Sequence, residues 1–162
     1  MLTNNIVNGM FDNLKKENPS KDHTDHDSPT YYNELVSLKV ETTDKKVMLG
    51  TNTLAYAFDP TGNAARNQYW FNKLVSIDLS SLDTSSVTNM NYMFASCYAL
   101  ESIDVSVFDT SKVVFMQGLF SCSFNLRNII GLTSFDVSNA CDISVMFADC
   151  ENLNIIDLSS FN

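Results

Sequence analysis

The sequence predicts an α/β repeat fold, a stack of about four to five coils that each contain a strand, a turn and a short helix. One pattern recurs from Leu74 to the end of the chain, with equivalent leucines 26 residues apart at Leu74, Leu100 and Leu126, and a further 27 on at Leu153. Within each copy the apolar spacing changes from strand-like to helix-like. A fixed period of this size is typical of proteins in which neighbouring repeats complete one shared core.

The first half of each copy predicts a short strand. Its pattern is L-x-x-I-x-L, and the alternation of an extended chain places Ile77 and Leu79 on one side and Ser76 and Asp78 on the other. Connections between parallel strands are right-handed in nearly all proteins. We therefore expect a right-handed stack with a short parallel sheet on one side.

The second half of each copy predicts a short helix. Apolar residues at Val87, Met90, Met93 and Phe94 have helical spacing over about two turns. Aspartates precede these segments, where their carboxylates would act as helix N-caps; they are Asp83, Asp109 and Asp136. Apolar side chains that recur at one repeat position should line the interior, and those expected in the core are Met93, Phe94, Phe120, Met146 and Phe147.

One phrase of the sequence has a recognisable form. The run I-D-L-S-S-L-D-T-S-S-V-T-N-M-N-Y-M-F-A-S-C resembles the 26-residue repeat of bacterial surface proteins and lipoproteins, a divergent leucine-rich-repeat family. The resemblance covers Leu74 to Asn162, reaches back in degraded form to Leu35, and is weakest in the third copy at Ile130 and Gly131. It implies a leucine-rich-repeat solenoid that binds proteins or surfaces and has no known catalytic centre.

The chain before the repeats predicts a cap. Residues 1–30 contain a helical apolar pattern followed by a polar loop, and we expect this region to cover the first coil. A helix that binds a partner or forms a dimer is the alternative. The apolar residues of the pattern are Ile6, Val7, Met10, Phe11 and Leu14. The solenoid is then expected to occupy residues 31–162.

An insertion at residues 59–72 interrupts the predicted solenoid. It carries Arg66, Tyr69 and Trp70, which are residue types favoured at interface hot spots. Insertions in repeat proteins lie in surface loops and often on a binding face. A partner-binding role and packing of Trp70 onto the first coil are both consistent with this pattern.

The balance of charge excludes some classes of partner. The net charge is −9 and the isoelectric point is about 4.4, and residues 74–162 carry ten acidic against two basic side chains. Binding to nucleic acid or to an anionic membrane needs Lys and Arg, so neither is expected. The sequence favours a protein partner with a basic surface.

Acidic residues recur at one outward strand position. Asp78, Asp104 and Asp157 occupy the same place in their repeats, and stacking would set them in a column about 5 Å apart per coil, with Glu101 beside it. Like charges so close cost stability unless solvent or a partner offsets them. We interpret this acidic column as a candidate partner-binding site. The alternative is that these aspartates only provide the exposed charge that solubility requires.

No catalytic or cofactor motif is present in the sequence. It contains no phosphate-binding loop, GxGxxG, GxSxG or HExxH, so we expect neither an enzyme nor a cofactor. His23 and His26 lie in a polar loop that favours no metal site. Cysteines recur near the repeat phenylalanines, at Cys97, Cys122 and Cys150, and are interpreted as small buried spacers rather than disulfides or metal ligands.

Two functional hypotheses remain open. One is an intracellular acidic binder that inhibits a nucleic-acid-handling enzyme, as phage anti-CRISPR proteins do. The other is a surface or adhesin-type protein that binds host or matrix proteins. The start of the sequence lacks the pattern of a signal peptide and predicts a cytoplasmic protein, whereas a trimmed start would leave secretion or surface display open.

The last residues predict self-association. We expect Leu153–Asn162 to form a strand and a turn with no capping coil after them. An uncovered strand edge leaves backbone groups unpaired and favours association with another chain. A homodimer through this C-terminal edge is expected, with the target protein as the alternative occupant. The residues that would matter are Ile155, Ile156 and Leu158.

Overall fold

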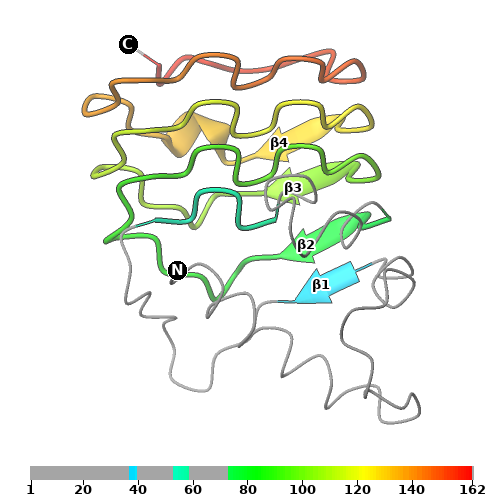
Figure 1. The fold of residues 1–162 in the computed structure, drawn as a ribbon, viewed down its shortest axis with the longest axis horizontal. Helices are drawn as coiled ribbons and strands as arrows, with labels where there is room; N and C mark the ends of the chain where they lie inside the picture. Colours follow the sequence, from blue (N-terminus) through cyan, green and yellow to red (C-terminus); the bar gives the residue numbers. More distant parts are fainter. Residues whose placement is uncertain (1–36, 40–52, 59–72, 162) are drawn as a thin grey trace, which may run out of the picture.

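The chain forms layers that lie one above another, as a computed structural model shows for residues 37–39, 53–58 and 73–161 (Figure 1). Short strands lie in successive layers, and turns make up most of the rest of the described chain. The regular elements are β1 (Ser37–Lys39), β2 (Ser76–Asp78), β3 (Ser102–Asp104), β4 (Asn128–Ile130) and the 3-10 helix η1 (Leu132–Ser134).

The strands pair in parallel. β1 pairs with β2, where Leu38 faces Ile77, and β3 pairs with β4, where Ile103 faces Ile129. In β2 and β3 the central isoleucine is buried and its neighbours point outward. One side chain in each of these two strands therefore enters the core, which is what a three-residue strand with period two allows.

A second set of parallel contacts joins the layers away from the strands. Isolated bridges connect Thr53 to Asn89, Asn89 to Phe115, and Phe115 to Asp142. From each bridge the chain continues with alternate backbone N–H groups that donate to the next layer. Phe94 N–H, for example, donates to the carbonyl of Leu119 at 2.9 Å.

The predicted fold class is wrong. The described residues contain no α-helix, and their strands are three residues long in two separate two-stranded sheets, so the expected α/β leucine-rich-repeat solenoid of strand–turn–short-helix coils is not found. The predicted N-terminal capping helix, at residues 1–30, lies outside the described residues, as does the insertion at residues 59–72.

Turns replace the predicted helices because the backbone N–H groups find better partners in the next layer. In a helix Phe94 N–H would donate to the carbonyl of Met90, four residues back. Instead Met93 N–H donates to Met90 at 3.2 Å and Ala95 N–H donates to Tyr92 at 3.2 Å, each three residues back. Tyr92 has φ of 54°, in the left-handed region, which interrupts any helix.

Phenylalanines form a ladder through the core. The rings of Phe58, Phe94, Phe120 and Phe147 stack in sequence, with centroids 5.2, 5.6 and 5.8 Å apart. Met93, Phe94, Phe120 and Met146 are buried as expected, whereas Phe147 is only partly buried. Phe147 is the last ring of the ladder, so among the described residues no further ring covers it.

The aspartates predicted to cap helices instead close turns. Asp83 and Asp109 each accept a hydrogen bond at 3.0 Å from the backbone N–H two residues ahead. Such side-chain turns need no helix after them. The threonine after Asp109 links two layers: Thr110 Oγ1 accepts from Asp136 N–H at 2.8 Å and donates to the Asp136 carbonyl at 3.1 Å.

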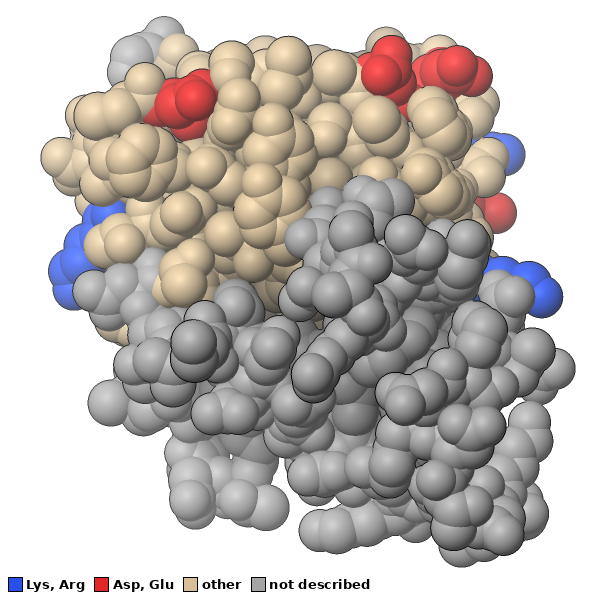
Figure 2. All heavy atoms as spheres, viewed as in Figure 1, with Lys and Arg blue, Asp and Glu red and all other residues tan. Residues whose placement is uncertain are grey.

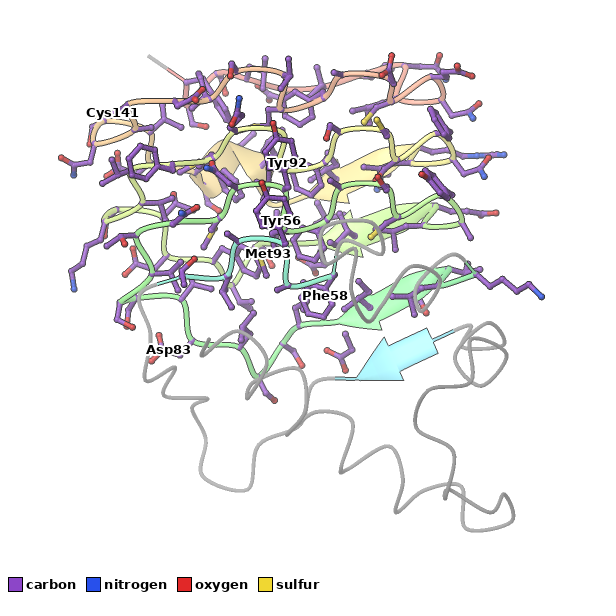
Figure 3. The ribbon with its side chains drawn as sticks, in the orientation of Figure 1. Tyr56, Phe58, Asp83, Tyr92, Met93 and Cys141 are labelled. Atoms are coloured by element: carbon purple, nitrogen blue, oxygen red, sulfur yellow. The ribbon has the colours of Figure 1, made fainter. Side chains whose placement is uncertain are left out.

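The cysteines share this role of joining layers only in part. Cys97 and Cys150 donate to the carbonyl of a core phenylalanine in the preceding layer, and Ser123 does so in the layer between them. The predicted spacer Cys122 lies one residue off this position and is half-buried, whereas Cys141 is exposed on the outer side of the stack (Figure 3). All four thiols are free.

One glycine is required by a close approach. Tyr56 and Tyr92 stack at 5.2 Å in neighbouring layers (Figure 3), and the Tyr92 ring extends over the position of Gly118 in the layer above. A Cβ at Gly118 would lie 2.3 Å from Cε1 of Tyr92, and its φ is +60°. Only glycine meets both conditions without strain.

Candidate functional site

The acidic side chains of the repeats lie at the surface. Residues 73–161 contain ten carboxylates and three basic residues, and none of the ten carboxylates is buried. In Figure 2 the acidic atoms gather along the edge of the described surface where the C-terminal layers lie, and Lys and Arg lie at its two sides. Most of the described surface in this view carries no charged side chain.

The structure places Asp78 and Asp104 in the expected relation. Both end a strand, and β2 and β3 are neighbours because Glu101 N–H approaches the Val75 carbonyl at 3.4 Å. That register, 26 residues apart, sets Asp78 beside Asp104. The two carboxylates therefore belong to adjacent layers on the outer side of the strands.

The acidic column does not continue without interruption. Asp104 faces Ile130 in the register of β3 and β4, so an exposed apolar side chain separates it from the layer of Asp157. The backbone of Glu101 lies between Val75 in the preceding layer and Arg127 in the next layer. Arg127 N–H donates to the Glu101 carbonyl at 2.9 Å. A basic residue thus follows Glu101 in the next layer.

Hydrogen bonds hold the carboxylates in their ionised form. Asp104 Oδ1 accepts from Ser106 N–H at 2.9 Å, and Asp157 Oδ1 accepts from Ser159 N–H at 2.9 Å. These serine hydrogen bonds lower the pKa of both carboxyls below the ordinary value. At neutral pH each is a fixed negative charge rather than a proton donor.

The remaining predicted site residues are not described. Arg66, Tyr69 and Trp70 all lie in residues 59–72, outside the described part of the chain. The structure therefore brings together Asp78, Asp104 and, beside them, Glu101. It leaves Asp157 apart by one layer.

Sequence reasoning missed a second acidic group. Asp142, Asp149 and Glu151 lie in the turns of residues 142–151. One signal pointed there, because the sequence has no Lys or Arg after Arg127.

The described residues contain neither a membrane-spanning helix nor a metal-binding group. None of their helices is long and apolar enough to cross a membrane. Residues 37–39, 53–58 and 73–161 also contain no group of three or more His, Cys, Asp or Glu side chains that could hold a metal ion.

Comparison with protein families matches residues 63–161, more than half of the chain, to the family described as "Mycoplasma protein of unknown function, DUF285". No curated protein and no solved structure matched the chain. The chain belongs to the DUF285 family.

Proposed function

We propose that this member of the DUF285 family is a non-catalytic protein-binding module that docks through its acidic surface on a basic partner, such as the nucleic-acid groove of an enzyme. The observation that carries the proposal is that none of the ten carboxylates of residues 73–161 is buried, and that only three basic residues accompany them. An excess of one sign on a surface steers partners of the opposite sign and selects against others.

The local chemistry supports binding rather than proton transfer. A general acid or base works best when its pKa is near the working pH. The shifted carboxyl pKa values lie below the ordinary value and so further from neutral pH, because serine hydrogen bonds favour the ionised form. Those with a lowered pKa are Asp104, Asp109, Asp136, Asp142 and Asp157.

The test compares two triple variants that remove the same charge. The first changes the acidic column, with Asp78→Asn, Asp104→Asn and Asp157→Asn. The control changes the turn aspartates, with Asp83→Asn, Asp109→Asn and Asp136→Asn. Asparagine keeps the side-chain oxygen that accepts each backbone hydrogen bond, so both variants should fold.

The probe is a 20-residue polylysine peptide, with affinity measured by calorimetry over a range of NaCl concentrations. We expect the column variant to weaken binding several-fold and to flatten its salt dependence, and the control to change both much less. Unchanged affinity and salt slope in the column variant, or equal losses in the two variants, would refute the column as the binding site. Attention would then move to Arg66, Tyr69 and Trp70.

A further inference from the structure

One copy of the repeat departs from the others at the outward end of its strand. Three copies have an aspartate at this position, at Asp78, Asp104 and Asp157, whereas the remaining copy has Ile130. Ile130 is 47% exposed, and the register of β3 and β4 pairs it directly with Asp104. Paired residues of neighbouring strands direct their side chains to the same side of the sheet. Ile130 therefore lies on the outward side, beside a carboxylate.

The aspartate of the other copies has a local role that this copy fills in another way. Asp104 Oδ1 closes its turn by accepting from Ser106 N–H at 2.9 Å. Isoleucine cannot accept a hydrogen bond, and η1 closes the equivalent turn with backbone groups instead. Ser134 N–H donates to the Gly131 carbonyl at 3.0 Å. The side chain of Ile130 is therefore not needed to close the turn.

Close packing fixes the position of Ile130 relative to Asp104. Val105 N–H donates to the Ile130 carbonyl at 2.9 Å. The next residue, Gly131, has φ of +86°, and a Cβ there would lie 2.3 Å from Cα of Ser106, so only glycine allows this approach. The isoleucine and the carboxylate are thus held side by side before any partner binds, which lowers the ordering cost of association.

A second carboxylate lies on the other side of Ile130. The layer of Asp157 packs on the layer of Ile130, where Ser160 Oγ donates to the Leu132 carbonyl at 3.2 Å. Neighbouring strands lie about 5 Å apart, so Ile130 is one layer away from the carboxylate of Asp104 and one layer away from that of Asp157. We call these three residues the Ile130 site.

The chemistry of the Ile130 site matches one kind of side chain. Lys and Arg have a long apolar stem and a cationic head, and they pack the stem on apolar surface while the head stays with polar groups. Such a side chain can cover the isoleucine and still place its charge against a carboxylate in the neighbouring layer. A short cationic side chain would reach the carboxylate without covering the isoleucine, and an acidic one would be repelled.

We propose that Asp104, Ile130 and Asp157 form a recognition site for a long cationic side chain, lysine or arginine, of the partner protein. The stem packs on Ile130 and the cationic head pairs with one of the two carboxylates. This inference rests on the proposed function, which supplies the sign of the partner's charge. It goes further by assigning to Ile130 the selection of long cationic side chains over short ones.

Two homopolymers of equal length and charge probe the selection of stem length. Polylysine has a four-carbon stem in each side chain, whereas poly-2,4-diaminobutyrate has a stem shorter by two methylene groups. Both are cationic at about pH 6, because their amines titrate above neutral pH. Calorimetry measures the two dissociation constants. The natural protein should bind polylysine about five- to tenfold more tightly, because the longer stem buries more methylene groups on Ile130.

The site variant is Ile130→Asn, which removes the apolar side chain without changing the charge. It should lower the preference for polylysine to less than about twofold and leave the salt dependence of binding unchanged. The matched control is Phe115→Asn. Phe115 is 43% exposed and lies in the turns, and the chain has Asn89 at the equivalent position. This control should keep the full preference for polylysine.

A third variant, Ile130→Asp, restores the aspartate of the other copies. The added charge should raise the affinity for poly-2,4-diaminobutyrate and steepen the salt dependence, while the preference for polylysine is lost. All three positions are at least partly exposed, so the variants should keep the circular dichroism spectrum of the natural protein. A preference for polylysine that persists in Ile130→Asp would contradict the role of the isoleucine.

The outcomes separate this inference from the proposed function. Loss of the preference in Ile130→Asn, with the preference kept in Phe115→Asn, supports the Ile130 site. An unchanged preference in Ile130→Asn, or equal losses in the two variants, would overturn the Ile130 site. The proposed function would still stand if the triple variant of the acidic column weakens polylysine binding. Normal polylysine binding by that triple variant would overturn both proposals, because the cationic head would then have no carboxylate partner.

Discussion

Phe120→Ala tests the core of this fold most directly. Phe120 is fully buried, and its ring stacks between those of Phe94 at 5.6 Å and Phe147 at 5.8 Å, with interplanar angles of 7° in both pairs. Its carbonyl accepts from Cys150 Sγ at 3.1 Å. The substitution therefore breaks a ladder in the middle and leaves a cavity between two layers.

The expected cost follows from these contacts. Burial of a phenylalanine side chain contributes about 1.5–3 kcal/mol, and each stacked partner adds about 0.5–1.5 kcal/mol. Large-to-small changes at such sites cost about 3–5 kcal/mol in free energy of unfolding, and we expect a value in that range. Phe147→Ala is the matched comparison. Phe147 is partly buried and has one ring neighbour among the described residues, so it should cost about 1–2 kcal/mol.

Urea denaturation followed by circular dichroism measures both values. The midpoint should fall in the order natural protein, Phe147→Ala, Phe120→Ala, with an unchanged dependence on urea concentration. A loss below about 1 kcal/mol for Phe120→Ala would show that this face of the turns does not form the core. Equal losses of stability at the two positions would refute the claim that a ring stacked on both sides contributes more than the ring at the end of the ladder.

Three further predictions concern polar groups. Thr110→Val should cost about 1–3 kcal/mol in urea denaturation, because the N–H and carbonyl of Asp136 lose their buried hydroxyl partner, whereas Thr133→Val at an exposed position should cost little. Burial raises the pKa of the Cys150 thiol to about 11, so iodoacetamide at pH 8 should alkylate exposed Cys141 first, and mass spectrometry that finds Cys150 modified as fast would contradict this. The folded-state pKa values of five aspartates lie below the ordinary value of 3.8. The stability that these carboxylates contribute is therefore complete above pH 3.8 and is lost as pH falls through the lowered pKa values. Urea titrations from about pH 6 to pH 2 should show this loss of stability, and replacing all five aspartates by Asn should make the pH dependence flatter. The five are Asp104, Asp109, Asp136, Asp142 and Asp157.

The relative placement of Asp78 and Asp104 was predictable because outward strand positions follow from the alternation of an extended chain. Asp78 and Asp104 were placed correctly beside each other by the repeat period alone. The break at Ile130 was also visible in the sequence, but its consequence for Asp157 depends on the register of β4, which the structure gives.

The sequence by itself determined which residues are inside and how far apart the layers recur. Val87, Met90, Met93 and Phe94 are all buried, as their spacing predicted. Only the tertiary structure decided how the backbone brings them there. Each N–H group in that segment can donate either to a carbonyl in its own turn or to a carbonyl in the next layer. The spacing of apolar residues along the sequence is the same in both cases. Stacking supplies the second partner for every alternate residue, and so the chain forms turns where an isolated segment with this spacing would favour a helix.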